Sequence, residues 1–380
     1  METKENETLK ALRDAVILIP SLEPDERLPA YIQKLTESGF GHVVVVDDGS
    51  SAAYQEIFNR IEGIVPQVVV LHHDVNHGKG VALKTGYKWI QENLPEISGV
   101  ITADADGQHT VPDCVHLAEE LEKGKRALYL GARDFSLPNV PPKSRTGNRF
   151  TSGLFFLMYG QWLQDTQTGL RAFRKEDLQM MIDVEGDRFE YEMNVLIACV
   201  RQKLPIISIT IETVYENENK GTHYHPFRDS MRIFRVIVRG FVKFMGVSLL
   251  CFLVDQLLFN LLRSWLFPLM GLHLELDLPL GLEVDNTSLA NYTARLFSAI
   301  LNFRLNRELV FKVKGSKGTA WRYAVTCVAI IILSTLGIKA LGLLGMKPWL
   351  AKLICDFLLY FVSYQVQQRW VFSKSEDKQQ

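Results

Sequence analysis

Short runs of hydrophobic residues alternate with amphipathic stretches between residues 14 and 107. The runs at 14–20, 42–50, 67–73 and 99–107 are rich in valine and isoleucine and show no alternation with polar residues. The stretches at 28–40 and 77–94 repeat apolar residues at helical spacing. Buried strands that alternate with helices predict an α/β domain whose mostly parallel sheet is covered by helices on both faces.

A second pattern begins near residue 241, where long apolar segments replace the evenly spread charges of the first part. Such segments lie at 244–266, 288–311, 323–345 and 349–371, and each approaches the roughly 20 residues that cross a bilayer. Arg295 and Asn302 interrupt the second segment. The pattern predicts an all-α domain of four transmembrane helices.

Charges in the loops predict how these helices are oriented. The loop at 267–287 carries acids and no Lys or Arg, whereas the loop at 304–322 is rich in Lys and Arg. By the positive-inside rule the second loop and both termini are cytoplasmic. The polar residues 1–14 lack the apolar core of a signal peptide, which agrees with this orientation. We expect a multi-pass protein of the cell (inner, cytoplasmic) membrane with its first domain in the cytoplasm.

A basic amphipathic stretch joins the two parts. Basic residues spaced by three or four share one helical face there, and apolar residues cover much of the rest. Such a helix suits the surface of an anionic leaflet, so membrane lipids are expected partners. The expected organisation is a cytoplasmic domain at 1–228, an amphipathic helix at 229–243, a transmembrane domain at 244–372 and a cytoplasmic tail at 373–380.

Composition excludes some classes of function. The net charge is −1, which gives no support to nucleic-acid binding, because that calls for a strongly basic domain. The five cysteines are widely spaced and form no CxxC pair, so we interpret them as reduced residues of the core or membrane rather than as disulfides or a zinc site.

Polar residues follow several of the predicted strands directly. Asp47 and Asp48 follow the second strand, the segment 76–79 follows the third, and Asp104 and Asp106 follow the fourth. Ligands of parallel sheets bind at the carboxyl ends of the strands, so these loops converge on one crevice. Two carboxylates with the amide oxygen of Gln108 are hard ligands suited to Mg²⁺ or Mn²⁺. Neither a P-loop nor a GxGxxG motif is present.

Ordered motifs over about 14–240 make the chain resemble the family 2 glycosyltransferases of the polyprenyl-phosphate type, such as dolichyl-phosphate mannose synthase. The motifs are IPSLEPDE, VVVVDDGSS, NHGKGVALKTG, DADGQH, GARDF, SRTGNRF, DTQTGLRAF and FEYEMNVL. The resemblance implies a GT-A fold and an inverting transfer from a nucleotide-diphosphate sugar, UDP- or GDP-linked. One position departs from the family, whose opening motif commonly reads P-x-x-N-E where this chain has Glu23 and Pro24.

The resemblance also implies roles for residues of this chain, by position. Nucleotide contacts are expected from Pro20, Glu23, Asp47, Asp48, Lys79, Asp104 and Ala105. Metal contacts fall to Asp104, Asp106 and Gln108. Sugar contacts fall to Asp165, Gln167, Gly169 and Glu192, and acceptor-phosphate contacts to Arg133, Arg145, Lys220, Thr222 and His223. The residues nearest the reaction would be Asp104, Asp106, Arg133 and Arg145.

The residues that the reaction needs depend on whether the acceptor is a phosphate or a hydroxyl group. A cation on the leaving diphosphate stabilises the negative charge that develops there. A lipid phosphate has a second pKa near ~6 and is already mostly dianionic at neutral pH, so it needs positioning more than deprotonation. Paired arginines suit that task through bidentate contacts. With a hydroxyl acceptor, a glycolipid or glycan, Asp106 or Glu192 would instead serve as base.

The apolar half resembles the GtrA-like membrane family over about 241–372, through Asp255, NFRLNRELVF and QRWVF. That family is associated with surface-polysaccharide assembly and often proposed to move lipid-linked sugars. The alternatives are therefore a flippase for such a sugar, or an anchor and platform for a homo-oligomer. Ionisable residues in the predicted spans are functional candidates or structural ion pairs. They are Asp255, Arg295, Lys352 and Asp356.

A weak internal repeat divides these helices into two hairpins. Lys243–Phe244 opens the first predicted span and Arg322–Tyr323 opens the third. LNRELVF at 305–311 ends the second span, and VQQRWVF at 366–372 ends the fourth. Two hairpins with a basic and aromatic edge on the cytoplasmic side would explain the repeat, although aromatic and basic belts are also a general feature of membrane proteins.

Overall fold

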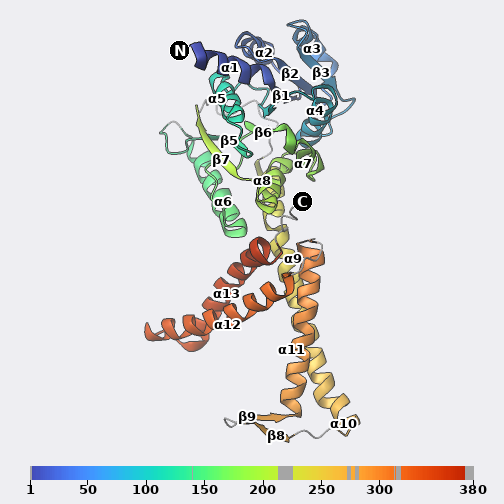
Figure 1. Cartoon of the computed structure of the whole chain (residues 1–380), viewed down its shortest axis with the longest axis vertical. Coiled ribbons are helices and arrows are strands. Elements are labelled where there is room, and N and C mark those ends of the chain that lie inside the picture. Colours follow the sequence, from blue (N-terminus) through green and yellow to red (C-terminus); the bar gives the residue numbers. More distant parts are fainter. Residues whose placement is uncertain are drawn as a thin grey trace. The chain divides into compact units, whose positions relative to one another are not determined.

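The chain folds into two compact units, Met1–Ile237 and Val238–Gln380, in a computed structural model (Figure 1). The structure describes residues 2–138, 140–212, 226–271, 275–278, 282–311, 313 and 318–372.

A seven-stranded sheet forms the centre of the first unit, in the order β3-β2-β1-β4-β6-β5-β7. The strands are β1 (Ala15–Ser21), β2 (His42–Asp47), β3 (Val68–His72), β4 (Gly99–Thr102), β5 (Leu128–Arg133), β6 (Arg171–Arg174) and β7 (Ile206–Ile211). Only β6 runs antiparallel to its neighbours β4 and β5. The prediction of a mostly parallel α/β sheet is therefore confirmed, and the four predicted strands are β1 to β4.

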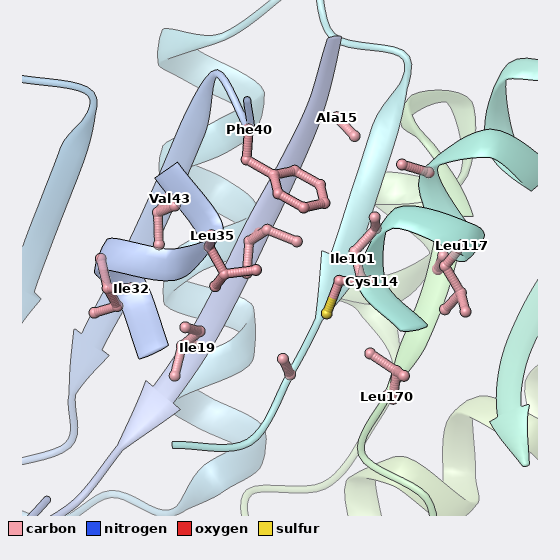
Figure 2. Packing of buried hydrophobic residues seen from close by; sticks show 14 of the residues in the cluster. Ala15, Ile19, Ile32, Leu35, Phe40, Val43, Ile101, Cys114, Leu117 and Leu170 are labelled. Carbon is pink, nitrogen blue, oxygen red and sulfur yellow. The ribbon is translucent and has the colours of Figure 1, made fainter. Parts of the chain in front are cut away.

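Helices cover both faces of this sheet. They are α1 (Glu2–Asp14), α2 (Arg27–Glu37), α3 (Gln55–Glu62), α4 (Lys79–Asn93), α5 (Val111–Glu122), α6 (Pro142–Tyr159), α7 (Leu178–Asp183) and α8 (Glu190–Gln202). Figure 2 shows Ile32 and Leu35 of α2 facing Ile19 of β1 and Val43 of β2, within one cluster of buried apolar residues. Alternate residues of β1 point the other way, where Leu18 packs against α4.

The second unit is mostly helical. Helix α9 (Pro226–Leu261) begins in the first unit and continues into the second, which also contains the short α10 (Phe267–Leu269), the long helices α11 (Asn286–Leu305), α12 (Thr319–Leu343) and α13 (Pro348–Val366), and the hairpin β8 (Glu275–Leu278) and β9 (Leu282–Asp285). Helices occupy all the predicted apolar segments, and the predicted stretch 229–243 is part of α9 rather than a helix of its own. Within the described residues, the stretches Ser230–Leu269 and Thr319–Leu343 are long and apolar enough to span a membrane.

Two π-helical segments occupy equivalent places in the internal repeat. Asn306–Val310 continues α11 and Gln367–Val371 continues α13. Their last turns close through matching bonds, from Phe311 N–H to the Asn306 carbonyl at 2.9 Å and from Phe372 N–H to the Gln367 carbonyl at 2.8 Å. The side chains of Asn306 and Gln367 contact each other at 3.4 Å. The two hairpins therefore meet through the same local structure.

The aromatic contacts around these segments are also paired. The Phe244–Tyr364 and Tyr323–Phe303 centroids lie 5.4 and 5.3 Å apart, and those of Phe311–Tyr364 and Phe372–Phe303 lie 5.9 and 5.7 Å apart. Phe311 and Phe372 stack on each other at 4.9 Å, each being the counterpart of the other. The repeat predicted from the sequence thus becomes an approximate twofold arrangement of contacts.

The packing of α4 on β1 predicts opposite effects for two glycine substitutions. A Cβ on Gly86 of α4 would lie 2.3 Å from Leu18 Cδ1, whereas a Cβ on Gly153 of α6 would meet no atom within 4 Å. Both changes to alanine favour the helix by about 0.5–1 kcal/mol. Overpacking against the fully buried Leu18 costs about 1–3 kcal/mol. We expect Gly153→Ala to raise the thermal unfolding midpoint and Gly86→Ala to lower it; equal midpoints would contradict the packing.

Candidate functional site

A cavity of about 540 Å³ lies at the carboxyl ends of the sheet strands, within the first unit. It is lined by residues that follow β1, β2, β4 and β5, together with the start of α4 and parts of α8 and α9. The lining includes these predicted site residues: Pro20, Glu23, Asp48, Lys79, Asp104, Ala105, Asp106, Gln108, Arg133, Gln167 and Glu192. The convergence expected from the strand ends is therefore present.

Lys79 connects three parts of the cavity wall. Its Nζ, at the start of α4, lies 2.7 Å from Asp104 Oδ1 after β4 and 3.0 Å from Glu192 Oε1 of α8. Burial alone would lower the pKa of Lys79, but the two carboxylates outweigh it and raise that pKa above its ordinary value. Lys79 is thus a permanent cation beside the carboxylates.

The two aspartates of the DADGQ segment are in different electrostatic states. Burial opposes ionisation of Asp104, but the charge of Lys79 and a bond from His109 Nε2 at 3.2 Å hold its pKa well below the usual range. Burial, and then the negative charge of Asp104, raise the pKa of Asp106. The carboxylate of Asp106 accepts the backbone N–H of Gln108 at 3.0 Å. Of the two aspartates, Asp104 is the one whose carboxylate contacts Lys79 directly.

Close packing fixes the position of Asp104 from the other side. A Cβ on Gly169 would lie 2.4 Å from Asp104 Oδ2 and 2.6 Å from Oδ1. The position therefore accepts no side chain while Asp104 stays where it is. Gly169 was predicted to line the sugar site. In the structure it packs against the carboxylate of Asp104 and is not among the residues that line the cavity.

Asp48 shapes the loop that precedes α4. It is 4% exposed, and its carboxylate accepts His73 Nδ1 at 2.8 Å, His77 N–H at 3.0 Å and Gly78 N–H at 2.7 Å. Gly78 has φ +103, and a Cβ there would lie 2.4 Å from the Asp187 carbonyl, so the loop requires glycine at this position. Asp48 therefore holds the NHGKG segment while it lines the cavity.

Asp47 lies beneath the cavity instead of in its wall. It is 1% exposed, and it accepts Ser50 N–H at 2.8 Å and contacts His72 Nδ1 at 2.9 Å. Burial raises its pKa, but these hydrogen bonds outweigh burial, and the pKa is lowered overall. Its predicted contact with the nucleotide remains a prediction.

The two arginines predicted to bind a phosphate are placed differently. Arg133 lines the cavity, with Nε 2.7 Å from Asp165 Oδ2 and Nη2 3.2 Å from Asp165 Oδ1. Asp165 is fully buried, so it orients Arg133 and does not itself line the cavity. Arg145, on α6, donates through Nη2 to the Leu137 carbonyl at 2.8 Å and is outside the cavity lining. The predicted Lys220, Thr222 and His223 lie outside the described residues.

Sequence reasoning missed two groups that shape this site. His109 follows the DADGQ segment directly, yet its bond to Asp104 could not be read from the spacing. Arg228 and Arg232, near the start of α9, also line the cavity. Their spacing of four residues was the available signal, because it places both side chains on one helical face. Glu23, at the departing family position, adopts the left-handed backbone at φ +47, a conformation that asparagine adopts more readily.

The residues after β4 fit a divalent cation by their chemistry. Within the described residues no three His, Cys, Asp or Glu side chains are grouped to hold a metal. Asp104 and Asp106 nevertheless line one cavity. Burial is the larger cause that raises the pKa of Asp106, and the like charge of Asp104 raises it further. One or two carboxylates are the usual protein contribution where substrate phosphates complete the coordination of Mg²⁺.

Ionisable residues of the second unit have polar neighbours of their own. Asp255 is buried, with Oδ2 3.7 Å from Arg295 Nε, and its Oδ1 has no hydrogen-bond partner among the described atoms. Asp356 Oδ1 accepts the hydroxyl of Ser334 at 2.8 Å. The side chain of Lys352 lies outside what the structure describes.

Comparisons with known proteins match both units. The model of glycosyl transferase family 2 matches residues 17–181, and that of the GtrA/DPMS transmembrane domain matches residues 243–372. An uncharacterized protein of Methanocaldococcus jannaschii is 32% identical over 213 residues, which are 54% of this chain and 85% of that protein. A UDP-N-acetylglucosamine–dolichyl-phosphate N-acetylglucosaminyltransferase of Methanococcus voltae is 27% identical over 52% of this chain and 85% of its own length.

Among solved structures, glucosyl-3-phosphoglycerate synthase from Mycobacterium tuberculosis in complex with Mn²⁺, UDP-glucose and phosphoglyceric acid is similar to 62% of this chain. The match covers 82% of that chain, with 15% identity and a TM-score of 0.46.

The bridge through Lys79 predicts a pH-dependent loss of stability. Lys79→Met removes the cation that contacts Asp104 and Glu192, which costs about 3–5 kcal/mol of unfolding free energy. Without Lys79, burial raises the folded-state pKa of Asp104 above its unfolded value, so the loss is present at neutral pH and shrinks as pH falls through that folded-state pKa. We expect denaturant unfolding in EDTA to show a larger deficit at pH 7.5 than at pH 5.

The matched control is Lys88→Met, which removes the same charge from the exposed face of α4. It should change the unfolding free energy by less than about 0.5 kcal/mol at either pH. A deficit of Lys79→Met that did not depend on pH would contradict the charge bridge.

Proposed function

We propose the function of this chain from one premise: it belongs to glycosyl transferase family 2, and its C-terminal part carries the GtrA/DPMS transmembrane domain. It is a glycosyltransferase of the dolichyl-phosphate sugar transferase type, with a GT-A α/β domain followed by a helical membrane domain. The finer assignment is that it transfers a hexose, with inversion, from a nucleotide-diphosphate sugar to polyprenyl phosphate for the assembly of cell-surface glycans.

One observation carries this assignment. A single cavity at the strand ends is lined by Asp104 and Asp106 as well as by arginines of β5 and α9. Carboxylates suit the metal and diphosphate of a donor, whereas arginines suit a phosphate acceptor. The relative from Methanococcus voltae, named for transfer from a UDP sugar to dolichyl phosphate, supports the same pair of substrates.

The donor side follows from the residues at the start of α4 and the end of β4. Asp104 and Asp106, with Gln108, would hold Mg²⁺ or Mn²⁺, which supplies electrostatic stabilisation to the leaving diphosphate when bound. Lys79 keeps Asp104 ionised and oriented by a bond of 2.7 Å. Pro20, Glu23, Asp48 and Ala105 belong to the same wall of the cavity and are proposed to contact the nucleotide.

The acceptor side needs no strong base. A phosphate monoester is mostly dianionic at neutral pH, so the protein has to position it against the anomeric carbon. Glu192 is held by Lys79 at 3.0 Å, which suits a sugar contact more than proton abstraction. Arg133 is oriented by Asp165 and lines the cavity, which makes it a candidate for phosphate contact.

Membrane attachment would bring the catalytic unit to its lipid substrate. The GtrA/DPMS match and two long apolar helices support a membrane protein. We propose four spans, with residues 1–228 and both termini in the cytoplasm, because basic residues concentrate in the loop at 304–322 and acids in the loop at 267–287.

The direct test is transfer by the purified full-length chain. UDP- and GDP-linked sugars are offered one at a time with polyprenyl phosphate and Mn²⁺ or Mg²⁺, and the lipid product is identified by mass. A product one hexose heavier than the acceptor supports the proposal. Transfer to a diacylglycerol or a glycan but not to polyprenyl phosphate would contradict it.

Loss of the second aspartate should stop the reaction. We expect Asp106→Ala to lower kcat by about a hundredfold or more, since stabilisation of the leaving group is of that order. EDTA should have a comparable effect on the unaltered protein, reversed by Mn²⁺ or Mg²⁺. Asp183→Ala, at the exposed end of α7, is the control and should leave kcat unchanged. Substantial activity of Asp106→Ala would remove the metal role of this residue.

A further inference from the structure

Helix α9 contributes two arginines to the wall of the cavity. Arg228 and Arg232 are four positions apart, and both line the cavity together with Ile233. Residues four apart lie on the same face of a helix. The first turns of α9 therefore present a pair of guanidinium groups to the same space as Asp104 and Asp106.

Two cations on other elements of the cavity contact carboxylates. Lys79 bridges Asp104 and Glu192, and Arg133 makes a two-point contact with the buried Asp165. Arg145, the second arginine predicted from the sequence, is outside the lining. Arg27 and Arg188 also line the cavity, and Arg228 and Arg232 are the lining arginines that belong to α9.

The position of these arginines along α9 relates them to the bilayer. The helix runs without interruption from Pro226 to Leu261, and the stretch from Ser230 is apolar enough to span a membrane. The phosphate of a polyprenyl lipid stays at the bilayer surface, because its chain is buried in the hydrocarbon. A phosphate site on the first turns of a membrane helix is therefore where such a lipid can deliver its head group.

The start of α9 is also held in place within the first unit. The Tyr159 hydroxyl, at the end of α6, donates to the Ile237 carbonyl at 3.0 Å. Ile233 and Ile237 are buried on the same face of the helix. This packing fixes the rotation of α9, and with it the direction in which Arg228 and Arg232 project.

We propose that Arg228 and Arg232 form the phosphate subsite for the acceptor, which they hold as a phosphate monoester dianion. The inference rests on the proposed function and deepens it, because it names residues that the sequence motifs do not include. Two guanidinium groups neutralise the dianion and fix its orientation through charge-assisted hydrogen bonds. The donor diphosphate offers the same chemistry, so the experiment has to separate the two phosphates.

The test measures transfer by the full-length protein in detergent while each substrate is varied in turn. We expect Arg228→Gln and Arg232→Gln each to raise the KM for polyprenyl phosphate about tenfold or more and to change the KM for the nucleotide sugar less than about twofold. Arg228→Lys and Arg232→Lys keep the charge and should recover part of the loss. Thermal unfolding of each variant checks that the fold is intact.

Arg235→Gln is the matched control, since it removes one charge from the same helix outside the cavity lining. It should leave both KM values unchanged. The inference is overturned if the lipid KM stays within about twofold in the double variant Arg228→Gln/Arg232→Gln, or if the KM for the nucleotide sugar rises instead. Failure of the unaltered protein to use polyprenyl phosphate would overturn the proposed function itself, which is a separate outcome.

Discussion

The contact of Lys79 with two carboxylates determines the shape of the functional end of the sheet. Asp104 follows β4, Lys79 begins α4 and Glu192 belongs to α8, so one ammonium group ties together three elements that are distant in the sequence. Removal of Lys79 would leave two carboxylates of the wall without this cation. The remaining features of the wall are arranged around this point: His109 bonds the free side of Asp104, and Gly169 leaves room for its carboxylate.

Charge balance explains why this arrangement suits a divalent cation. Lys79 offsets one of the negative charges of Asp104 and Glu192, and Asp106 adds another, which leaves the group anionic when all are ionised. The pKa of Asp106 is raised by burial and, to a smaller extent, by repulsion from Asp104. A divalent cation would relieve that repulsion. Arginines of α9 and β5 line the same cavity as these carboxylates.

The sequence predicted the parts of this structure that depend on local pattern. Strands β1 to β4 were visible as apolar runs, and the gathering of polar residues at their ends followed from parallel topology. Strands β5, β6 and β7 were not predicted; RAFR of β6, at 171–174, carries arginine at both ends and shows no apolar run. Pairings such as Arg133 with Asp165, or Asp48 with His73, join residues 32 and 25 positions apart and leave no periodic signal. The spacing of Arg228 and Arg232 places them on one helical face, but it does not indicate that this face lines the cavity.

The paired π-helical segments of the second unit bear on how its two hairpins could work together. A hairpin that crosses a bilayer twice returns to the side from which it started, so a duplicated hairpin keeps its sidedness. If the two hairpins exchanged conformations across the Phe311–Phe372 stack, each end of the unit would stay on the same side of the membrane. Inverted repeats, by contrast, convert an inward-open form into an outward-open one when they exchange roles. Any movement of a lipid-linked sugar by this unit would therefore have to arise from the places where the copies differ, as at Arg307 and its counterpart Gln368, rather than from their likeness.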